Sequence, residues 1–173
     1  MTDLAYRDIE REIVGVLPEL RSAAEYYWRV EGTPGSDSGA YVFFESMFGA
    51  YVTILLALPN SPRRDRMLQR AFDLVETMLA RGDGEVRNLA FIGLLESRGA
   101  WWWQRAQPFM GPSARSALDS HEPGWVGETT GSTAGEPEFI DLYGVRPIIA
   151  HELAEEGISL DQVPGATYTR EAK

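Results

Sequence analysis

The sequence predicts an all-α protein, a helical bundle of about six to eight helices built on antiparallel αα-hairpins. Residues 83–96 give the clearest support, because their apolar side chains recur at the i, i+3, i+4 and i+7 spacing of one packed helix face. These side chains are Val86, Leu89, Ala90, Gly93 and Leu94. In addition, no segment sustains the alternation of apolar and polar residues that predicts a half-buried strand.

The first expected helix spans residues 2–30, with apolar side chains along one side. Pro18 lies inside this run, and its missing amide proton must kink the helix or split it into two helices. A loop rich in Gly and Ser is expected at residues 32–39.

Residues 40–58 form the most apolar segment, in which Glu45 is the only charged residue. Their number approaches that of a membrane span. The polar and small residues inside the segment, among them Glu45, Gly49 and Thr53, favour a helix buried in the core of a globular protein. We therefore expect no membrane partner.

An αα-hairpin is expected at residues 61–97. Ser61 can cap a helix that has Pro62 at its first position and ends near residue 81. Asp83 can cap the next helix after a very short turn, and two helices joined so closely must lie antiparallel.

The second helix of this hairpin resembles the second helix of a HEAT-type repeat, which implies a HEAT-like bundle. Its other side carries Phe91, Ile92 and Leu95, so we expect neighbouring elements to enclose most of its circumference. Two shorter helices are expected after it, at residues 101–107 and 112–120.

The C-terminal part of the chain divides into a linker and a helical element. Residues 121–138 are rich in Gly, Thr, Ser and Pro, and Trp125 is their only large apolar anchor. A helix broken at Pro147 is expected from residue 139 to 157, followed by a short terminal element. The expected organisation is a helical core at residues 1–120, a loop or linker, and a C-terminal element at residues 139–173 that is packed on the core or tethered to it.

Composition excludes several classes of protein. An apolar share of 44% is that of a folded globular chain. The chain has no cysteine, which excludes disulfides, thiolate metal sites and a cysteine nucleophile. The charged start does not resemble a signal peptide, so a cytoplasmic location is expected.

The net charge of −10 is concentrated near the C-terminus, since residues 116–173 hold 11 acidic and three basic residues. A protein that binds nucleic acid needs Lys and Arg side chains against phosphates, so we expect no nucleic-acid partner. An acidic surface suits a basic protein partner, because complementary fields speed association. The alternative is that the charge only keeps the protein soluble.

Two patterns are candidates for sites of chemistry. His151-Glu152 begins a zincin-like His-Glu-x-x-His pattern, but Glu155 stands where the second His belongs, so no metal site is expected. Glu45 is the best single candidate for a functional carboxylate, and if buried it could pair with Arg87. The favoured interpretation is an ordinary ion pair or a side chain that faces outward. Phosphate-binding and nucleophile-elbow motifs are missing, so neither a cofactor nor catalytic residues are expected.

Three consecutive tryptophans, Trp101, Trp102 and Trp103, point about 100° apart on a helix, so they cannot all enter one core. An exposed tryptophan often anchors a protein interface, and we assign Trp102 to that role. The alternative is that two of the rings pack in the core and the third is partly exposed.

The chain resembles a group of small, all-helical, largely uncharacterised bacterial proteins. The resemblance is carried by Glu85-Val-Arg-Asn-Leu, Leu94-Leu-Glu96, Leu118 and the element Met110-Gly-Pro-Ser-Ala-Arg115, in which Met replaces the usual Leu. It covers residues 40–120 and transfers no catalytic residue. Some of these proteins are encoded beside polymorphic toxins, so the resemblance implies a toxin-neutralising immunity role.

A second resemblance covers fewer residues. Val145-Arg-Pro, Ala150-His-Glu-Leu-Ala154 and Gly157-Ile-Ser-Leu-Asp-Gln-Val163-Pro-Gly165 are similar to the peripheral-subunit-binding domain of 2-oxoacid dehydrogenase acyltransferases. Here Pro147 follows Arg146 instead of preceding it, and most basic residues of that domain are missing. The resemblance implies a helix, a glycine and a short second helix.

The expected function is a non-catalytic protein-binding module, an immunity protein that neutralises a basic toxin through an acidic helical face. The proposed contact residues are Glu152, Glu155, Glu156, Asp161 and Trp102, extended by Glu136, Glu138 and Asp141. One alternative is a small helical enzyme or ligand-binding protein with Glu45 in a pocket. Another is a regulatory scaffold subunit that docks through its C-terminal element.

Overall fold

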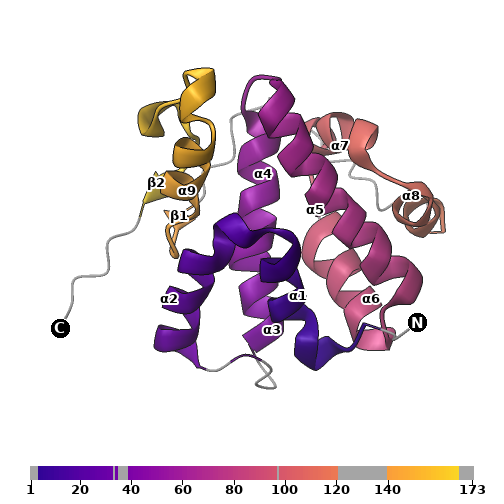
Figure 1. Cartoon of the computed structure of the whole chain (residues 1–173). Coiled ribbons are helices and arrows are strands. Elements are labelled where there is room, and N and C mark those ends of the chain that lie inside the picture. The colour runs from indigo at the N-terminus through magenta and orange to yellow at the C-terminus, as the bar shows by residue number, and fades with distance from the viewer. Residues whose placement is uncertain (1–3, 33, 35–38, 97, 121–139, 168–173) are drawn as a thin grey trace.

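The computed structural model describes residues 4–32, 34, 39–96, 98–120 and 140–167. Its helices pack around the central pair α4 and α5, with the C-terminal elements against one side of the bundle and α7 and α8 against the other (Figure 1). The all-α prediction is confirmed. Within the described ranges, the strands are two-residue segments that form one parallel pair. The linker expected at residues 121–138, with Trp125, Glu136 and Glu138, lies outside the described residues.

Pro18 splits the N-terminal region, as predicted. A 3-10 turn at Tyr6–Asp8 leads into α1, Ile9–Val16, and a second turn at Pro18–Leu20 leads into α2, Arg21–Glu31. Leu17 between the helices is fully buried and its amide still donates to the Ile13 carbonyl at 2.8 Å. The chain therefore changes direction without leaving the core.

The apolar segment is one continuous helix at the centre of the bundle. It consists of α3, Gly39–Phe43, a π-helical stretch, Phe44–Gly49, and α4, Ala50–Ala57. Of the described helices, only Gly39–Ala57 is long and apolar enough to span a membrane, and 61% of its most apolar stretch is buried by the rest of the protein. This burial is what is expected of a core helix.

The predicted αα-hairpin is present. Helix α5, Pro62–Arg81, is followed by α6, Gly84–Ala90, which continues as a π-helical stretch, Phe91–Leu95. The Ser61 side chain accepts a hydrogen bond from the Arg64 amide at 3.3 Å, and Asp83 accepts one from the Val86 amide at 2.9 Å. Both predicted caps are thus confirmed. Two shorter helices follow, α7, Ala100–Ala106, and α8, Pro112–Asp119.

The C-terminal unit, residues 140–167, begins differently from the prediction. Strand β1, Ile140–Asp141, pairs in parallel with β2, Ala166–Thr167, and α9 spans Val145–Glu152. The prediction of a helix that starts at residue 139 and is broken at Pro147 is therefore wrong. Pro147 lies in the first turn of α9, where its missing amide proton costs no helical hydrogen bond.

Asp141 explains where α9 starts. Its carboxylate accepts backbone hydrogen bonds at 2.8–2.9 Å from Gly144, Val145 and Arg146, and Gly144 takes the left-handed conformation (φ +81°) that this tight turn requires. Asp141 is 1% exposed. The prediction that it belongs to an exposed acidic surface is therefore wrong.

The C-terminal unit joins the same core as the rest of the chain. Val145, Ile149 and Leu153 of α9 are fully buried and belong to one apolar cluster with α4 and α5. After α9, Gly157 takes a left-handed conformation and a 3-10 turn follows at Leu160–Gln162, which is the helix, glycine and short second helix expected there.

The carboxyl end of α4 is buried, and two arginines donate hydrogen bonds to its carbonyl groups. Arg64 of α5 is 3% exposed; its guanidinium donates to the Leu55 carbonyl at 2.7 Å and to the Leu56 carbonyl at 3.2 Å. Arg105 of α7 donates to the Leu56 carbonyl at 2.7 Å. The last carbonyls of a helix have no partner within it, so a buried helix end needs side chains of this kind.

Replacing the buried arginine tests this role. We expect Arg64→Met to lower the free energy of unfolding by about 3 kcal/mol, because buried carbonyl groups are left without donors. Denaturant unfolding followed by circular dichroism measures the change. The matched control is Arg66→Met, which removes an exposed arginine from the same helix and should leave stability nearly unchanged. Equal effects of the two variants would contradict the assigned role.

Candidate functional site

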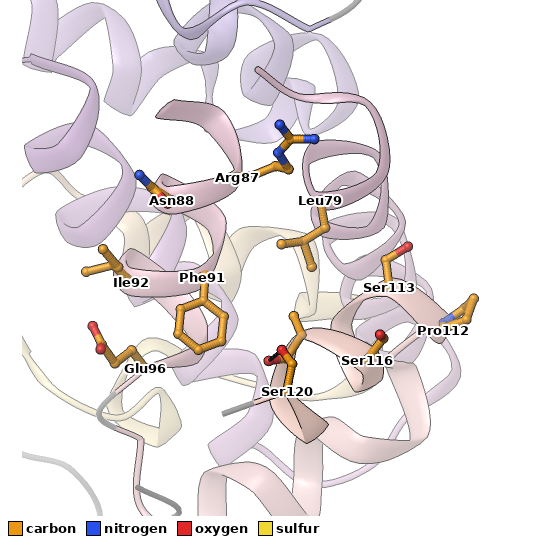
Figure 2. A pocket seen from close by; sticks show the side chains of 11 residues that line it. Leu79, Arg87, Asn88, Phe91, Ile92, Glu96, Pro112, Ser113, Ser116 and Ser120 are labelled. Carbon is orange, nitrogen blue, oxygen red and sulfur yellow. Dashed lines mark hydrogen bonds between the residues drawn. The ribbon is translucent and has the colours of Figure 1, made fainter. Parts of the chain in front are cut away.

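An open hollow of about 710 Å³ lies between two helical walls, one formed by α6 with its π-helical stretch and the other by α8. We call it the α6–α8 groove (Figure 2). It is lined by Leu79, Arg87, Asn88, Phe91, Ile92, Glu96, Pro112, Ser113, Ser116, Ala117 and Ser120.

The first wall exposes apolar side chains that the sequence predicts to be covered. Ile92 is 47% exposed and Phe91 is only half-buried, so the prediction of an enclosed helix is wrong at these two positions, although Leu95 is buried. The reason is the π-helical stretch, in which the Glu96 amide donates to the Phe91 carbonyl five residues earlier, at 2.8 Å. The 3.6-residue period of a regular α-helix therefore does not predict which side chains of this π-helical stretch are buried.

A close contact accompanies the π-helical stretch. Gly93 lies against the ring of Phe44, and a Cβ atom at this position would come within 2.8 Å of that ring. Gly93 therefore packs into the core, while the residues just before it face the groove. In Figure 2 the Phe91 ring points into the hollow from this wall.

The second wall is made of small residues. Ser113, Ser116, Ala117 and Ser120 follow the i, i+3, i+4 and i+7 spacing of one face of α8. Glu76 of α5 holds this helix in place, since its carboxylate accepts hydrogen bonds from the backbone amides of Ser113 at 2.8 Å and Ala114 at 2.7 Å. These amides are the unpaired donors of the first helical turn.

The chemistry of the groove suits binding. Among its lining residues the charged side chains are Arg87 and Glu96, and neither a histidine nor a pair of carboxylates stands beside the serines. The groove thus offers exposed apolar surface between one cation and one anion. Elsewhere in the described part of the chain, no three His, Asp or Glu side chains are placed to hold a metal ion.

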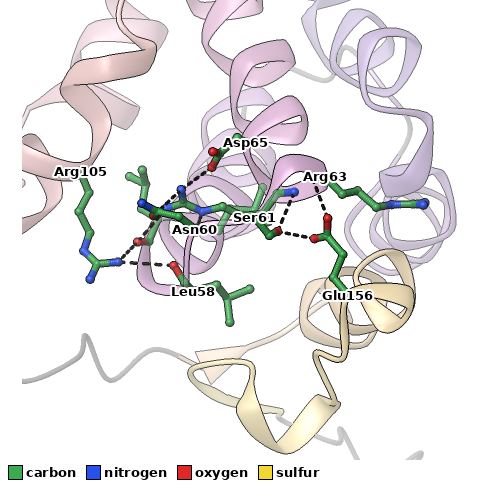
Figure 3. Close-up of polar contacts among 10 residues, drawn as sticks. Leu58, Asn60, Ser61, Arg63, Asp65, Arg105 and Glu156 are labelled. Carbon is green, nitrogen blue, oxygen red and sulfur yellow. Dashed lines mark hydrogen bonds and ion pairs between the residues drawn. The ribbon is translucent and has the colours of Figure 1, made fainter.

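The predicted acidic contact residues at the end of α9 and in the 3-10 turn that follows it, Ala154–Glu156, come together, but they contact the first residues of α5. Arg63 of α5 donates to Glu152 at 2.6 Å and lies 3.6 Å from Glu155. Glu156 accepts hydrogen bonds from the Ser61 hydroxyl and, at 2.9 Å, from the Arg63 amide (Figure 3). The glutamates therefore fasten the C-terminal unit to the first turn of α5.

Only part of this predicted surface stays exposed. The Glu155 side chain is 88% exposed, whereas that of Glu152 is 26% exposed. Asp161 is exposed and accepts a hydrogen bond from the Ser159 hydroxyl at 2.6 Å. The Ser159 bond holds the pKa of Asp161 below its usual value.

Trp102 is not available to a partner. It is 1% exposed, and its indole nitrogen donates to the Thr53 hydroxyl at 3.1 Å. The guanidinium of Arg98 lies over its ring, 5.6 Å from the centroid. The assignment of Trp102 to an interface is therefore wrong; its neighbours Trp101 and Trp103 are the half-buried members of the run.

Glu45 is exposed, in agreement with the favoured interpretation, and the hypothesis of a buried carboxylate in a pocket is wrong. The predicted partner Arg87 lines the α6–α8 groove, and it is Arg98 that lies within the field of Glu45. Burial lowers the pKa of Arg98, and the Glu45 carboxylate counteracts that effect. His151 is exposed as well.

A substitution at Gly111 tests whether the Glu76 carboxylate holds α8 in place. A Cβ atom at Gly111 would lie 2.4 Å from the Glu76 carboxyl carbon, so we expect Gly111→Ala to displace the cap and lower the free energy of unfolding by about 1–3 kcal/mol. Gly15→Ala is the control, because nothing lies within 4 Å of its Cβ position in α1; it should stabilise the protein by about 0.5–1 kcal/mol. Changes of the same sign in the melting temperatures of the two variants would contradict the role assigned to Gly111.

The pH dependence of stability tests the contact between Glu156 and α5. Hydrogen bonds from the Ser61 hydroxyl and the Arg63 amide lower the pKa of Glu156 from its ordinary value of 4.5. A lowered folded-state pKa adds stability above 4.5, which is lost as the pH falls through the folded-state pKa. We therefore expect the Glu156→Gln variant to have a lower melting temperature than the wild type at neutral pH.

That difference in melting temperature should shrink as the pH falls below 4.5. Glu155→Gln is the matched control, since its exposed side chain makes one long contact and should have little effect at either pH. A difference that does not depend on pH would show that the charge of Glu156 is not what fastens the unit.

Most of the chain matches a known protein family. A family model described as "Domain of unknown function (DUF7674)" matches residues 11–125. This range includes both walls of the α6–α8 groove and ends before the C-terminal unit. Neither a curated protein nor a solved structure matches the chain.

Proposed function

Because the chain belongs to this family, DUF7674, whose description states no activity, we propose a function from the site itself: the protein is a non-catalytic protein-binding module that holds its partner in the α6–α8 groove. The observation that carries the proposal is the exposure of Ile92, 47%, beside the half-buried ring of Phe91 on the groove wall. Apolar side chains exposed in a groove and bounded by charged groups are typical of protein interaction sites.

The charge of the chain supports a basic partner. A net charge of −10 produces a field that attracts positively charged proteins and speeds their association, while the groove supplies the contacts that hold them. The resemblance to proteins encoded beside polymorphic toxins makes a basic toxin the first partner to test. In that case the protein neutralises the toxin as an immunity protein, by binding alone and in the cytoplasm.

In this proposal the acidic residues of the C-terminal unit have a changed role. Glu152 and Glu156 hold the unit on α5, so they contribute to the partner surface only through the overall field. Glu155 and Asp161 remain exposed and can add charge around the interface. The docking contacts themselves belong to the groove.

Affinity capture with matched variants tests the proposal. The tagged protein is expressed in its native host and recovered at low and moderate salt, and bound proteins are identified by mass spectrometry. We expect the wild type to retain a stoichiometric basic partner and Ile92→Glu to lose it, with binding at least about tenfold weaker. The charge introduced at Ile92 must be desolvated on docking, which is unfavourable.

The control variant is Val42→Glu, because Val42 is 45% exposed but does not line the groove. It should retain the partner as the wild type does. A partner that both variants retain equally would place the interface elsewhere and overturn the proposal. If the partner inhibits growth when expressed alone, rescue by the wild type and failure of rescue by Ile92→Glu would support the immunity role.

A further inference from the structure

We propose that the α6–α8 groove binds one amphipathic helix of a protein partner, oriented parallel to α6. Its N-terminal end carries an acidic residue opposite Arg87, its C-terminal end carries a basic residue opposite Glu96, and apolar residues between them contact Phe91 and Ile92. This inference rests on the proposed function and specifies the chemistry of the occupant at the same site.

The shape of the groove favours a helix. Both walls are helices, and a groove between helices is the surface onto which an amphipathic helix lays its apolar face. On the α8 wall, Ser113, Ser116 and Ser120 have short side chains, so the backbone of an incoming helix can come close. On the other wall Phe91 and Ile92 supply the apolar contact area.

The positions of the two charges set the length of the occupant. Arg87 lies in the last turn of α6 and Glu96 directly follows the π-helical stretch, so at the rise of a helix they are separated by about 13 Å along the wall. This distance corresponds to two or three turns of a partner helix. A segment of about 14 residues therefore covers the groove with one charged residue near each end.

The same charges set the direction of the occupant. An acidic residue near the N-terminus and a basic residue near the C-terminus stabilise a helix through its dipole. A helix with this arrangement pairs its acidic end with Arg87 and its basic end with Glu96 only when it runs in the direction of α6. The reversed direction places like charges opposite each other at both ends.

A second copy of this chain is a poorer occupant than a partner protein. Two copies carry −10 each, and like net charges oppose association. At the groove itself, α8 has no acidic residue in its first turn and ends with Asp119, so it lacks the charge order that the groove accepts.

The test is a phage-displayed library of helical segments of about 14 residues, selected on the wild type after depletion on Ile92→Glu. We expect the enriched sequences to share an apolar stripe, an acidic residue in the first turn and a basic residue in the last. A synthetic peptide of that consensus should bind the double variant Arg87→Glu/Glu96→Arg about tenfold more weakly than the wild type, measured by fluorescence anisotropy. The same peptide with its two charges exchanged should reverse this preference.

Three results would overturn the inference: no enrichment over the Ile92→Glu protein, enriched sequences without the charge order, or a wild-type dimer in light scattering that Ile92→Glu makes monomeric. Val42→Glu is the control for the peptide measurements, and melting temperatures verify that each variant is folded. A natural partner that depends on Ile92 but presents a loop to the groove would overturn this inference and leave the proposed function standing. A natural partner that is independent of Ile92 would contradict both.

Discussion

The buried carboxyl end of α4 is the constraint on which the rest of the structure depends. The core helix ends inside the protein, where its last carbonyl groups cannot reach water. The guanidinium groups of Arg64 and Arg105 supply the missing donors, and the region around them is shown in Figure 3. A guanidinium has five donors in a rigid fork and stays charged when buried, so one arginine can donate hydrogen bonds to several carbonyl groups at once.

This constraint determines where the other elements stand. Because Arg64 must reach the end of α4, α5 has to start beside it, and Ser61 caps α5 at that point. From there α5 runs along the bundle and carries Glu76 and Leu79 to the opposite side. Glu76 holds α8 and Leu79 lies between the walls of the α6–α8 groove, so the position of the groove follows from the way the core helix ends.

The features that the sequence predicted correctly are those determined by neighbouring residues. Ser61 and Asp83 each cap a helix by accepting a hydrogen bond from the amide three residues later in the chain. The ring of Pro18 interrupts the helical run in which it lies. Short sequence patterns are therefore enough to predict both caps and this break. The αα-hairpin of α5 and α6 is predictable because the turn between them is so short that the two helices must lie antiparallel. Local chemistry therefore predicts most of the helices and their order.

The features that the sequence did not reveal depend on residues far apart. The bonds from α8 to Glu76 and from Arg63 to Glu152 join positions 37 and 89 residues apart, and no local pattern marks such pairs. The π-helical stretch shifts the exposed residues away from the regular period, so a periodic pattern predicts Phe91 and Ile92 to be covered. The orientation of Trp102 depends on a hydroxyl of the core helix, Thr53, which only the packed structure brings near.

The way the C-terminal unit is held has a consequence for the order of folding. Its internal contacts are local, because Asp141 binds the turn that follows it and Arg146 donates to the carbonyl of Val163. Its contacts with α5 join residues 89 to 95 positions apart, so they require the closure of a long loop, whose entropic cost is met only after the bundle has formed. We therefore expect the unit to dock late in folding, onto a surface that the bundle has already formed.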